Sequence, residues 1–245
     1  MQEILSNGQS TDSWSKPVNC SQEKSHFRQC FWQGSLDSED CQPADRKDVS
    51  NILHHCCMVL GAYGKTIDDL EKEIKKQNPS FDKGCILKFD HPKSRGACPP
   101  YFICVDQRRQ EIGMYIRGLN LLHRQDYASL MSSRKDEQEF DGGYVHPGMM
   151  EPAKWAFKFV APILRKELLK YSGYQLIIAG HSLGAGVAAL FTLLLLQDRA
   201  VIGGIPAAQI KGYAIEPPRV MSMELAHTIY LTSSVSFIRM IFFQG

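Results

Sequence analysis

An apolar stretch at residues 174–197 limits the possible folds of this chain more than any other feature. It reads YQLIIAGHSLGAGVAALFTLLLLQ. Residues 175–179 form a short isoleucine-containing run, which is typical of a strand buried on both faces. Residues 183–197 are apolar on nearly every side, which is typical of a helix in a protein interior. The stretch therefore predicts a buried strand that leads directly into a buried helix.

A G-x-S-x-G pattern, from Gly180 to Gly184, joins the predicted strand to the predicted helix. In this context the pattern indicates a nucleophile elbow, a sharp turn that holds a serine in strained backbone. The positions two residues before and after the serine must lack side chains, and glycine occupies both. We therefore expect Ser182 to be a catalytic nucleophile whose Oγ atom stands above the edge of a sheet.

Two other interpretations apply to the same stretch. Its length suits a membrane span, but His181 and Ser182 interrupt it, and the unbroken apolar part at 187–196 is too short to cross a bilayer. It also fits a strand and a helix with a serine placed there by chance. Neither alternative explains the motifs elsewhere in the chain, so we expect no transmembrane helix.

Three further segments accompany the elbow: IRGLNL at 116–121, FDGGYVH at 140–146 and GYAI at 212–215. In their order and spacing the four motifs resemble the class 3 lipases of the α/β-hydrolase superfamily. Within that family they resemble the plant branch related to sn-1-specific diacylglycerol lipases, some of whose members are labelled calmodulin-binding heat-shock proteins. The resemblance covers most of the chain, from about residue 45 to about residue 232.

The resemblance implies a three-layer α/β-hydrolase sandwich with a mixed, mostly parallel sheet. It also implies a serine carboxylic-ester hydrolase that cleaves acylglycerols in lipid metabolism, without a metal or an organic cofactor. In this family one oxyanion-hole amide follows the strand before the elbow, and the other belongs to the residue after the serine. These amides correspond here to the backbone N–H groups of Leu119 and Leu183. Many class 3 lipases have Thr or Ser at the position of Leu119. Leu119 still offers its backbone amide, but its side chain has no hydroxyl group.

The acid and the histidine of a catalytic triad should follow the serine, because α/β-hydrolases keep the chain order Ser, Asp or Glu, His. After Ser182 the available groups are Asp198, Glu216, Glu224 and His227. Asp198 ends the elbow helix and is expected to point away from the site. We therefore consider Glu216 and His227 as a rescue pair, which requires His227 to come within hydrogen-bond distance of the serine Oγ.

The C-terminal end differs from the family pattern. Family members continue beyond the strand expected at 229–235 with an Asp-rich segment, a Pro-Arg pair and a distant histidine. Here the expected acid position falls near Arg239 and Met240, and residues 236–245 are mainly apolar. We therefore expect a C-terminally truncated lipase that lacks its last elements and has impaired activity, through a frameshift, alternative splicing or a mistaken gene model.

Three segments are expected along the chain. Residues 1–43 are polar without an apolar period, which indicates a disordered N-terminal tail. Residues 44–235 form the incomplete class 3 lipase-like domain, whose size suits a single domain. Residues 236–245 form an aberrant apolar C-terminal tail.

The net charge, the N-terminal sequence and the cysteine spacing argue against nucleic-acid binding, secretion and a zinc site. With 28 basic and 26 acidic residues, the net charge of +2 gives no electrostatic footprint for nucleic acid. The N-terminus has no basic segment followed by an apolar core, so we expect no secretory signal and a cytoplasmic or peripheral membrane location. We interpret the 8 cysteines as thiols, and the spacing of Cys20, His26, Cys30 and Cys41 fits no usual zinc site.

Apolar periodicity predicts the remaining elements. The expected core face of the first helix comprises Val49, Ile52, Leu53, Cys56, Val59 and Leu60. His146 is interpreted as a structural residue before a helix that opens at Pro147. The expected helices span 48–61, 67–76 and 149–171, a helix-like segment spans 222–227, and the expected strands span 101–106, 111–117 and 209–215, the first two as a hairpin.

Residues 120–141 resemble in position the lid region of class 3 lipases. Their apolar residues are few, Tyr127, Leu130 and Met131 among them. A moving lid and an exposed loop both remain open interpretations of this segment.

Residues 154–170 form a basic amphipathic segment with five positive charges and one negative charge, Glu167. Such segments bind calmodulin or lipid surfaces, but a scaffold helix with a solvated outer face has the same pattern. Pro162 would kink a free target helix, which favours the scaffold interpretation. The alternative function is therefore a catalytically inactive protein that binds a lipid surface or calmodulin through this segment.

Overall fold

A computed structural model describes residues 46–90, 97–119, 138–222, 225 and 235–238. The chain divides into two compact units, residues 1–45 and 46–245, and all of the described residues belong to the second unit. The expected N-terminal tail lies outside the described residues, as does most of the expected lid. The domain boundaries therefore stay predictions.

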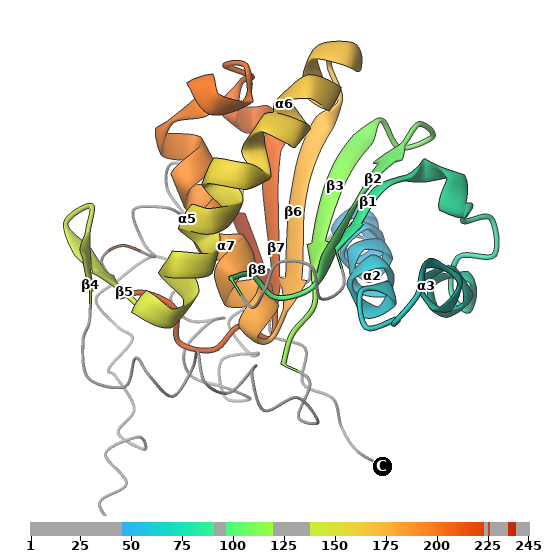
Figure 1. The fold of residues 1–245 in the computed structure, drawn as a ribbon, viewed down its shortest axis with the longest axis horizontal. Helices are drawn as coiled ribbons and strands as arrows, with labels where there is room; N and C mark the ends of the chain where they lie inside the picture. Colours follow the sequence, from blue (N-terminus) through green and yellow to red (C-terminus); the bar gives the residue numbers. More distant parts are fainter. Residues whose placement is uncertain (1–45, 91–96, 120–137, 223–224, 226–234, 239–245) are drawn as a thin grey trace, which may run out of the picture. The chain divides into compact units, whose positions relative to one another are not determined.

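The core of the second unit is a 6-stranded sheet with the strand order β1-β2-β3-β6-β7-β8 (Figure 1). β2 runs antiparallel to β1 and β3, whereas β3, β6, β7 and β8 run parallel to one another. This confirms a mixed, mostly parallel sheet and the predicted hairpin. The strands are β1 (Ile86–Asp90), β2 (Tyr101–Asp106), β3 (Glu111–Ile116), β6 (Gln175–His181), β7 (Ile210–Ile215) and β8 (Val235–Ile238), and β4 (Gln138–Phe140) pairs with β5 (Gly143–Val145) in a separate hairpin.

The last strand of the sheet differs from expectation in position. β8 begins at Val235 and pairs in parallel with β7 as far as Ile238. The sheet therefore extends three residues into the segment 236–245, which we expected to be a tail. Residues 226–234, which hold most of the strand expected at 229–235, lie outside the described part of the chain.

Helices cover both faces of the sheet, which gives the three layers expected from the sequence (Figure 1). Side chains alternate between the faces of each strand, so Met114 packs with the helices on one face and Tyr115 with those on the other. One face is covered by α5 (Pro147–Phe159), α6 (Ala161–Lys170) and α7 (Leu183–Gln197), and the other by α2 (Arg46–Gly61) and α3 (Ile67–Lys75); short 3-10 turns are η3 (Lys83–Cys85), η4 (Arg199–Ile202) and η5 (Ala207–Gln209).

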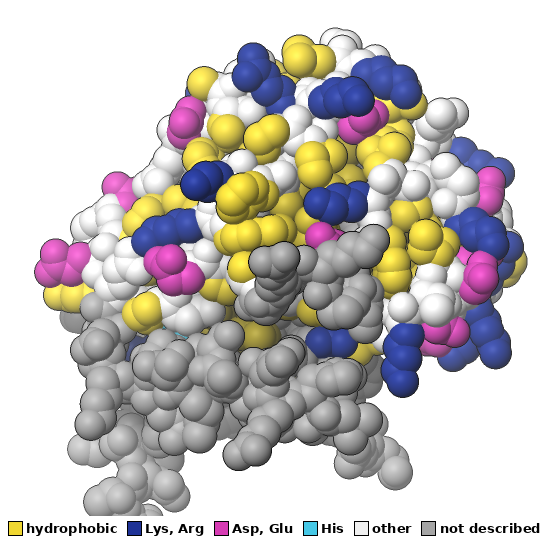
Figure 2. Space-filling model, in the orientation of Figure 1, with side chains coloured by type: hydrophobic (Ala, Val, Ile, Leu, Met, Phe, Trp, Pro, Cys, Tyr) yellow, Lys and Arg dark blue, Asp and Glu magenta, His cyan; other side chains and the backbone are white. Residues whose placement is uncertain are grey.

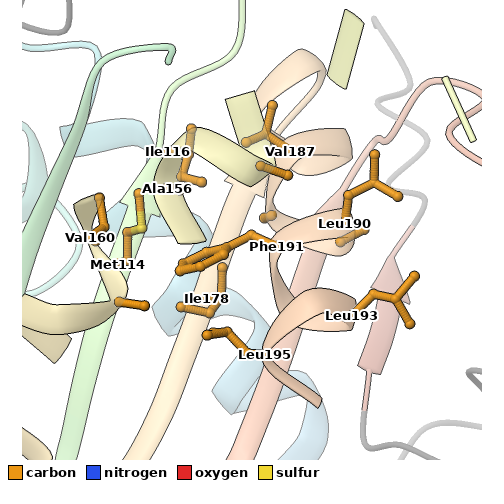
Figure 3. Close-up of a cluster of buried hydrophobic side chains, with 14 of the residues drawn as sticks. Met114, Ile116, Ala156, Val160, Ile178, Val187, Leu190, Phe191, Leu193 and Leu195 are labelled. Atoms are coloured by element: carbon orange, nitrogen blue, oxygen red, sulfur yellow. The ribbon is translucent and has the colours of Figure 1, made fainter. Parts of the chain in front are cut away.

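α7 is buried on nearly every side, as its sequence predicts. At Gly186 an added Cβ atom would lie 2.1 Å from the Met149 Sδ atom, so glycine lets α5 approach α7 closely. Within the described residues no helix is long and apolar enough to span a membrane. Figure 3 shows the apolar core around α7, with Met114, Ile116, Ala156, Val160, Ile178, Val187, Leu190, Phe191, Leu193 and Leu195 labelled.

The predicted apolar face of α2 is partly wrong. Val49, Leu53 and Leu60 are 41%, 52% and 48% exposed, whereas His55 is fully buried. The ring of His55 packs against Tyr213 on the sheet, with ring centroids 4.3 Å apart. The helix therefore faces the core with His55, Cys56 and Val59, and Val49, Leu53 and Leu60 lie outside its buried face.

The single helix predicted at 149–171 is two helices that meet at Val160. α5 begins at Pro147 as expected, and α6 carries Pro162 in its first turn. Proline has no N–H group to donate and fits the first turn of a helix, so it ends one helix and begins the next. The prediction of one continuous helix is therefore wrong at Val160.

Candidate active site

Ser182 lies in the sharp turn between β6 and α7, with φ 52° and ψ −121°. A positive φ in a non-glycine residue is strained, as expected of a nucleophile elbow. The turn is held on both sides: the Ser182 N–H group donates to the Ile215 carbonyl oxygen at 2.9 Å, and the Ser182 carbonyl oxygen accepts from the Ala185 N–H group at 2.9 Å. The surrounding structure therefore fixes the strained serine.

The two glycines of the G-x-S-x-G pattern are required by close backbone packing. A Cβ atom on Gly180 would lie 2.2 Å from the Gly184 carbonyl oxygen. A Cβ atom on Gly184 would lie 2.5 Å and 2.6 Å from the carbonyl oxygens of Arg117 and Ile116. No side chain fits at either position, because Gly180 lets the end of β6 approach α7 and Gly184 lets α7 approach the end of β3.

The segment after β3 reaches the elbow because Ile116 pairs with Gly180 in the sheet. Arg117 is buried, with 3% exposure; its N–H group donates to Pro100 at 2.9 Å and its Nε atom donates to the Gly118 carbonyl oxygen at 3.2 Å. Leu119 follows and packs against the apolar core. The two residues expected to supply oxyanion-hole amides, Leu119 and Leu183, thus belong to segments that meet at one edge of the sheet.

Leu183 is the first residue of α7. The first N–H groups of a helix have no acceptor inside the helix, and the helix dipole makes this end favourable for negative charge. Its amide is therefore suited to an oxyanion next to Ser182.

A chain of hydrogen bonds connects the elbow to its neighbours on both sides. The Gly118 N–H group donates to Tyr63 Oη at 3.1 Å, and Tyr63 Oη lies 2.7 Å from His181 Nδ1. His181 Nε2 lies 3.0 Å from Glu216 Oε2. The chain therefore runs from the end of β7, through the elbow, to the residue before Leu119.

One tautomer of the His181 ring satisfies the donors and acceptors along this chain. Tyr63 Oη accepts from Gly118 and has one proton, which it can donate to His181 Nδ1. His181 Nε2 then carries the imidazole proton and donates it to the Glu216 carboxylate. This tautomer, with a proton on Nε2, pairs every group in the chain.

The structure places Glu216 beside the elbow, where it contacts His181. Glu216 follows β7 with φ 49°, a second strained non-glycine position, and its Oε2 atom binds His181. His227 lies outside the described residues, as do the expected acid positions at Arg239 and Met240. The rescue pair and the truncation therefore stay predictions.

Asp198 is separated from the serine by the whole of α7, as expected. It follows Gln197, and its Oδ1 atom accepts from the Ala200 N–H group at 3.2 Å. At about 1.5 Å per residue, the helix separates it from Ser182 by roughly 20 Å. Asp198 takes no part in the site.

Sequence reasoning missed Tyr63 and the contacts of His181. Tyr63 lies in the turn after α2, 118 residues before His181, and no local pattern marks it. His181 lies inside the G-x-S-x-G pattern, so its position next to the serine was the available signal. Among the described residues, the cluster with metal-like spacing is His54, His55 and Glu111, at the opposite end of β3.

Comparisons with known proteins agree with this geometry. The family model described as Lipase (class 3) matches residues 114–241, just over half of the 245 residues. Diacylglycerol lipase-beta of Mus musculus is 29% identical over 126 residues, which cover 49% of this chain and 17% of that protein. The chain thus spans about a sixth of the length of this relative.

Solved structures of fungal lipases have a similar fold. A lipase from Rhizopus microsporus var. chinensis superposes with a TM-score of 0.64 at 19% identity, covering 80% of this chain and 66% of that chain. Lipase II from Rhizopus niveus gives a TM-score of 0.64 at 17% identity, covering 80% and 72%. Together with the match of the family model, this similarity establishes that the protein belongs to the class 3 lipase family and has the α/β-hydrolase fold.

Proposed function

We propose that this protein is a serine carboxylic-ester hydrolase that acts on acylglycerols. The observation that carries the proposal is the strained Ser182 in a G-x-S-x-G turn between the ends of β3 and β7 of a class 3 lipase fold. The relative named diacylglycerol lipase-beta supports an acylglycerol as substrate.

In the proposed reaction, Ser182 Oγ attacks the acyl carbonyl carbon and forms an acyl-enzyme as the glycerol oxygen leaves. The N–H groups of Leu119 and Leu183 hold the oxyanion, and one such donor contributes about 3 kcal/mol to lowering the barrier. Water then attacks the acyl-enzyme and releases the fatty acid. Glu216, His181, Tyr63 and Gly118 keep the Leu119 amide in place through their hydrogen bonds.

The proton of Ser182 requires a base, for which we propose His227 oriented by Glu216. Glu216 binds His181 through Oε2, so its Oε1 atom is the proposed acceptor for a second imidazole. Sharing one carboxylate between two histidines weakens the orientation of the base. We therefore propose impaired activity for this chain, because a serine without a well-oriented base is a weak nucleophile.

Fatty-acid release from detergent-dispersed diacylglycerol tests the proposal. Release by the wild-type chain above that of Ser182→Ala, with loss in His227→Ala, supports it. Equal release by the wild type and Ser182→Ala overturns the enzymatic function.

As a second function, which does not depend on catalysis, we propose that the protein binds peripherally to lipid surfaces. All five basic residues of 154–170 are exposed, whereas the single acid, Glu167, is 9% exposed. Phe159 and Leu169 are 49% and 67% exposed on the same segment. Figure 2 shows basic and apolar side chains intermixed on the face that α5 and α6 cover. This combination suits an anionic membrane surface.

Calmodulin is a weaker candidate for this segment. Calmodulin binds the apolar face of a target helix. In α6 that face holds Leu164 and Leu168, which belong to the core, and the helix breaks at Val160. Binding calmodulin therefore requires α6 to leave the sheet.

Sedimentation with phosphatidylcholine vesicles, with and without phosphatidylserine, tests the lipid surface. Lys158→Gln/Lys166→Gln should weaken binding to anionic vesicles about thirtyfold, because each basic residue near such a surface contributes about 1 kcal/mol. Lys65→Gln/Lys72→Gln changes exposed charges near and on α3 and should leave binding unchanged. Equal binding by both double variants, or calcium-dependent binding of the whole chain to calmodulin, contradicts the proposal.

A further inference from the structure

A compact group of metal-ligating side chains lies between α2 and the sheet. It comprises His54 and His55 of α2 and Glu111, the first residue of β3, whose ligand atoms all lie within 4.8 Å of one another. His55 is 0% exposed and Glu111 is 7% exposed. The group is far from Ser182: Glu111 pairs with Gln175 at the beginning of β6, whereas the elbow follows the end of β6.

Two ring nitrogens in this group are buried without a hydrogen-bond partner. The Nε2 atoms of His54 and His55 have none within the described part of the chain. Buried polar atoms are nearly always paired, so each exception calls for an explanation. Both unpaired nitrogens belong to histidines that are grouped with the buried Glu111 carboxylate. Two imidazoles and one carboxylate form a donor set that suits a cation.

The hydrogen bonding of the His55 ring supports this explanation. His55 Nδ1 lies 3.3 Å from Tyr115 Oη and can donate its proton there. That assignment leaves the Nε2 lone pair free, as in metal-bound histidines whose other ring nitrogen is hydrogen-bonded.

The charged groups around the cluster leave Glu111 available. Arg109 binds both oxygens of Glu111, at 2.9 Å and 3.3 Å, and also donates to Asn51 Oδ1 at 2.8 Å. A carboxylate offers about four lone-pair sites, so two remain when Arg109 occupies two. Arg109 and Lys211 repel a cation, and Asp106 offsets part of this repulsion. The expected affinity is therefore moderate.

We propose that His54, His55 and Glu111 bind a divalent transition-metal ion of the zinc type, with water as the remaining ligand. Two imidazoles and one carboxylate are a donor set that zinc takes in proteins. The ion joins the buried side of α2 to the first residue of β3, which makes it a structural cross-link rather than part of the ester chemistry. The proposal does not depend on hydrolase activity.

Calorimetric titration of the chelator-treated whole chain with Zn²⁺ tests the site. Stoichiometric binding and a rise in Tm of several degrees are expected, because a ligand that binds the folded state stabilises it. His54→Gln and Glu111→Gln should each reduce the affinity at least tenfold. His146→Gln is the matched control, because His146 also has a buried ring nitrogen without a partner among the described residues, outside the cluster; it should retain binding.

His54 is half-buried, whereas His55 is fully buried, so a change at His55 is expected to disrupt the fold. The test therefore uses His54→Gln, and circular dichroism checks that this variant is folded. Cys56 and Cys57 follow the cluster directly and are the competing ligands. Substitution with Co²⁺ should give visible bands without thiolate charge transfer in the near ultraviolet, and Cys56→Ser/Cys57→Ser should retain binding. Thiolate charge transfer, absence of stoichiometric zinc in the wild type, or unchanged affinity in folded His54→Gln would overturn the proposal.

Discussion

Tyr63 and His181 are 118 residues apart in the sequence, yet Tyr63 Oη lies 2.7 Å from His181 Nδ1. This contact connects the turn after α2 to the residue before the candidate nucleophile. The same Oη atom accepts the N–H group of Gly118, which precedes Leu119. One hydroxyl thus holds together the elbow and the loop proposed to bind the oxyanion.

Replacement of Tyr63 by Phe should lower the free energy of unfolding by roughly 1–3 kcal/mol, because it leaves the buried Gly118 N–H group and His181 Nδ1 without their partner. Urea denaturation measures this loss. Tyr144→Phe is the control, because the Tyr144 side chain is 43% exposed and should tolerate the change. Equal stability of the two variants would show that the Tyr63 hydroxyl does not hold the loop.

Replacement of Gly184 by Ala should cost about 3 kcal/mol or abolish folding, because the new Cβ atom meets backbone oxygens of Arg117 and Ile116 that cannot move away cheaply. Thermal unfolding followed by circular dichroism measures the effect. In Gly84→Ala the nearest atom is the Asp82 carboxylate at 3.2 Å, so this control should cost less than about 1 kcal/mol. A Gly184→Ala protein as stable as the control contradicts the packing at the elbow.

Replacement of Ser182 by Gly should increase the free energy of unfolding by about 1 kcal/mol relative to Ser182→Ala, because glycine adopts φ 52° without the strain that any side chain causes. Both variants lack the hydroxyl, so the comparison isolates the backbone. Parallel denaturant titrations measure the difference. If Ser182→Ala proves the more stable of the two, the turn stores no strain.

Cysteine reactivity should differ between Cys85 and Cys56, although both contact the same core cluster. Burial raises the pKa of Cys56 to about 11, so roughly one thiol in a thousand is ionised near pH 8. A hydrogen bond with Cys104 lowers the pKa of Cys85. Iodoacetamide near pH 8 should therefore modify Cys85 before Cys56, as peptide mass mapping can measure.

Cys104→Ala removes the hydrogen bond that favours the Cys85 thiolate and should slow the alkylation of Cys85. Modification of Cys56 at the same rate as Cys85 in the wild type would contradict both assignments.

The sequence predicted those elements whose structure depends on residues close together in the chain. The glycines around Ser182, the hairpin of β2 and β3, and the uniformly apolar α7 follow from backbone sterics and from periodic burial, which a short window of sequence contains. The family and the fold are confirmed for these reasons.

Contacts between distant segments could not be predicted in this way. The exposed side of α2 depends on His55 packing against Tyr213 of β7, which is 158 positions away in the printed sequence. The contact of Tyr63 with His181 has the same origin. The contact between Glu216 and the elbow histidine was not predicted either, and it arises because β7 ends directly beside the elbow. The predicted pairing of Glu216 with His227 stays a prediction.

Labelling of the whole chain with a fluorophosphonate probe tests the central claim most directly, because the probe reacts covalently with an activated serine. We predict slow labelling that Ser182→Ala abolishes and that His227→Ala and Glu216→Gln weaken. A folded wild-type chain that stays unlabelled, or that is labelled as strongly in Ser182→Ala, would contradict the assignment of Ser182 as an activated nucleophile.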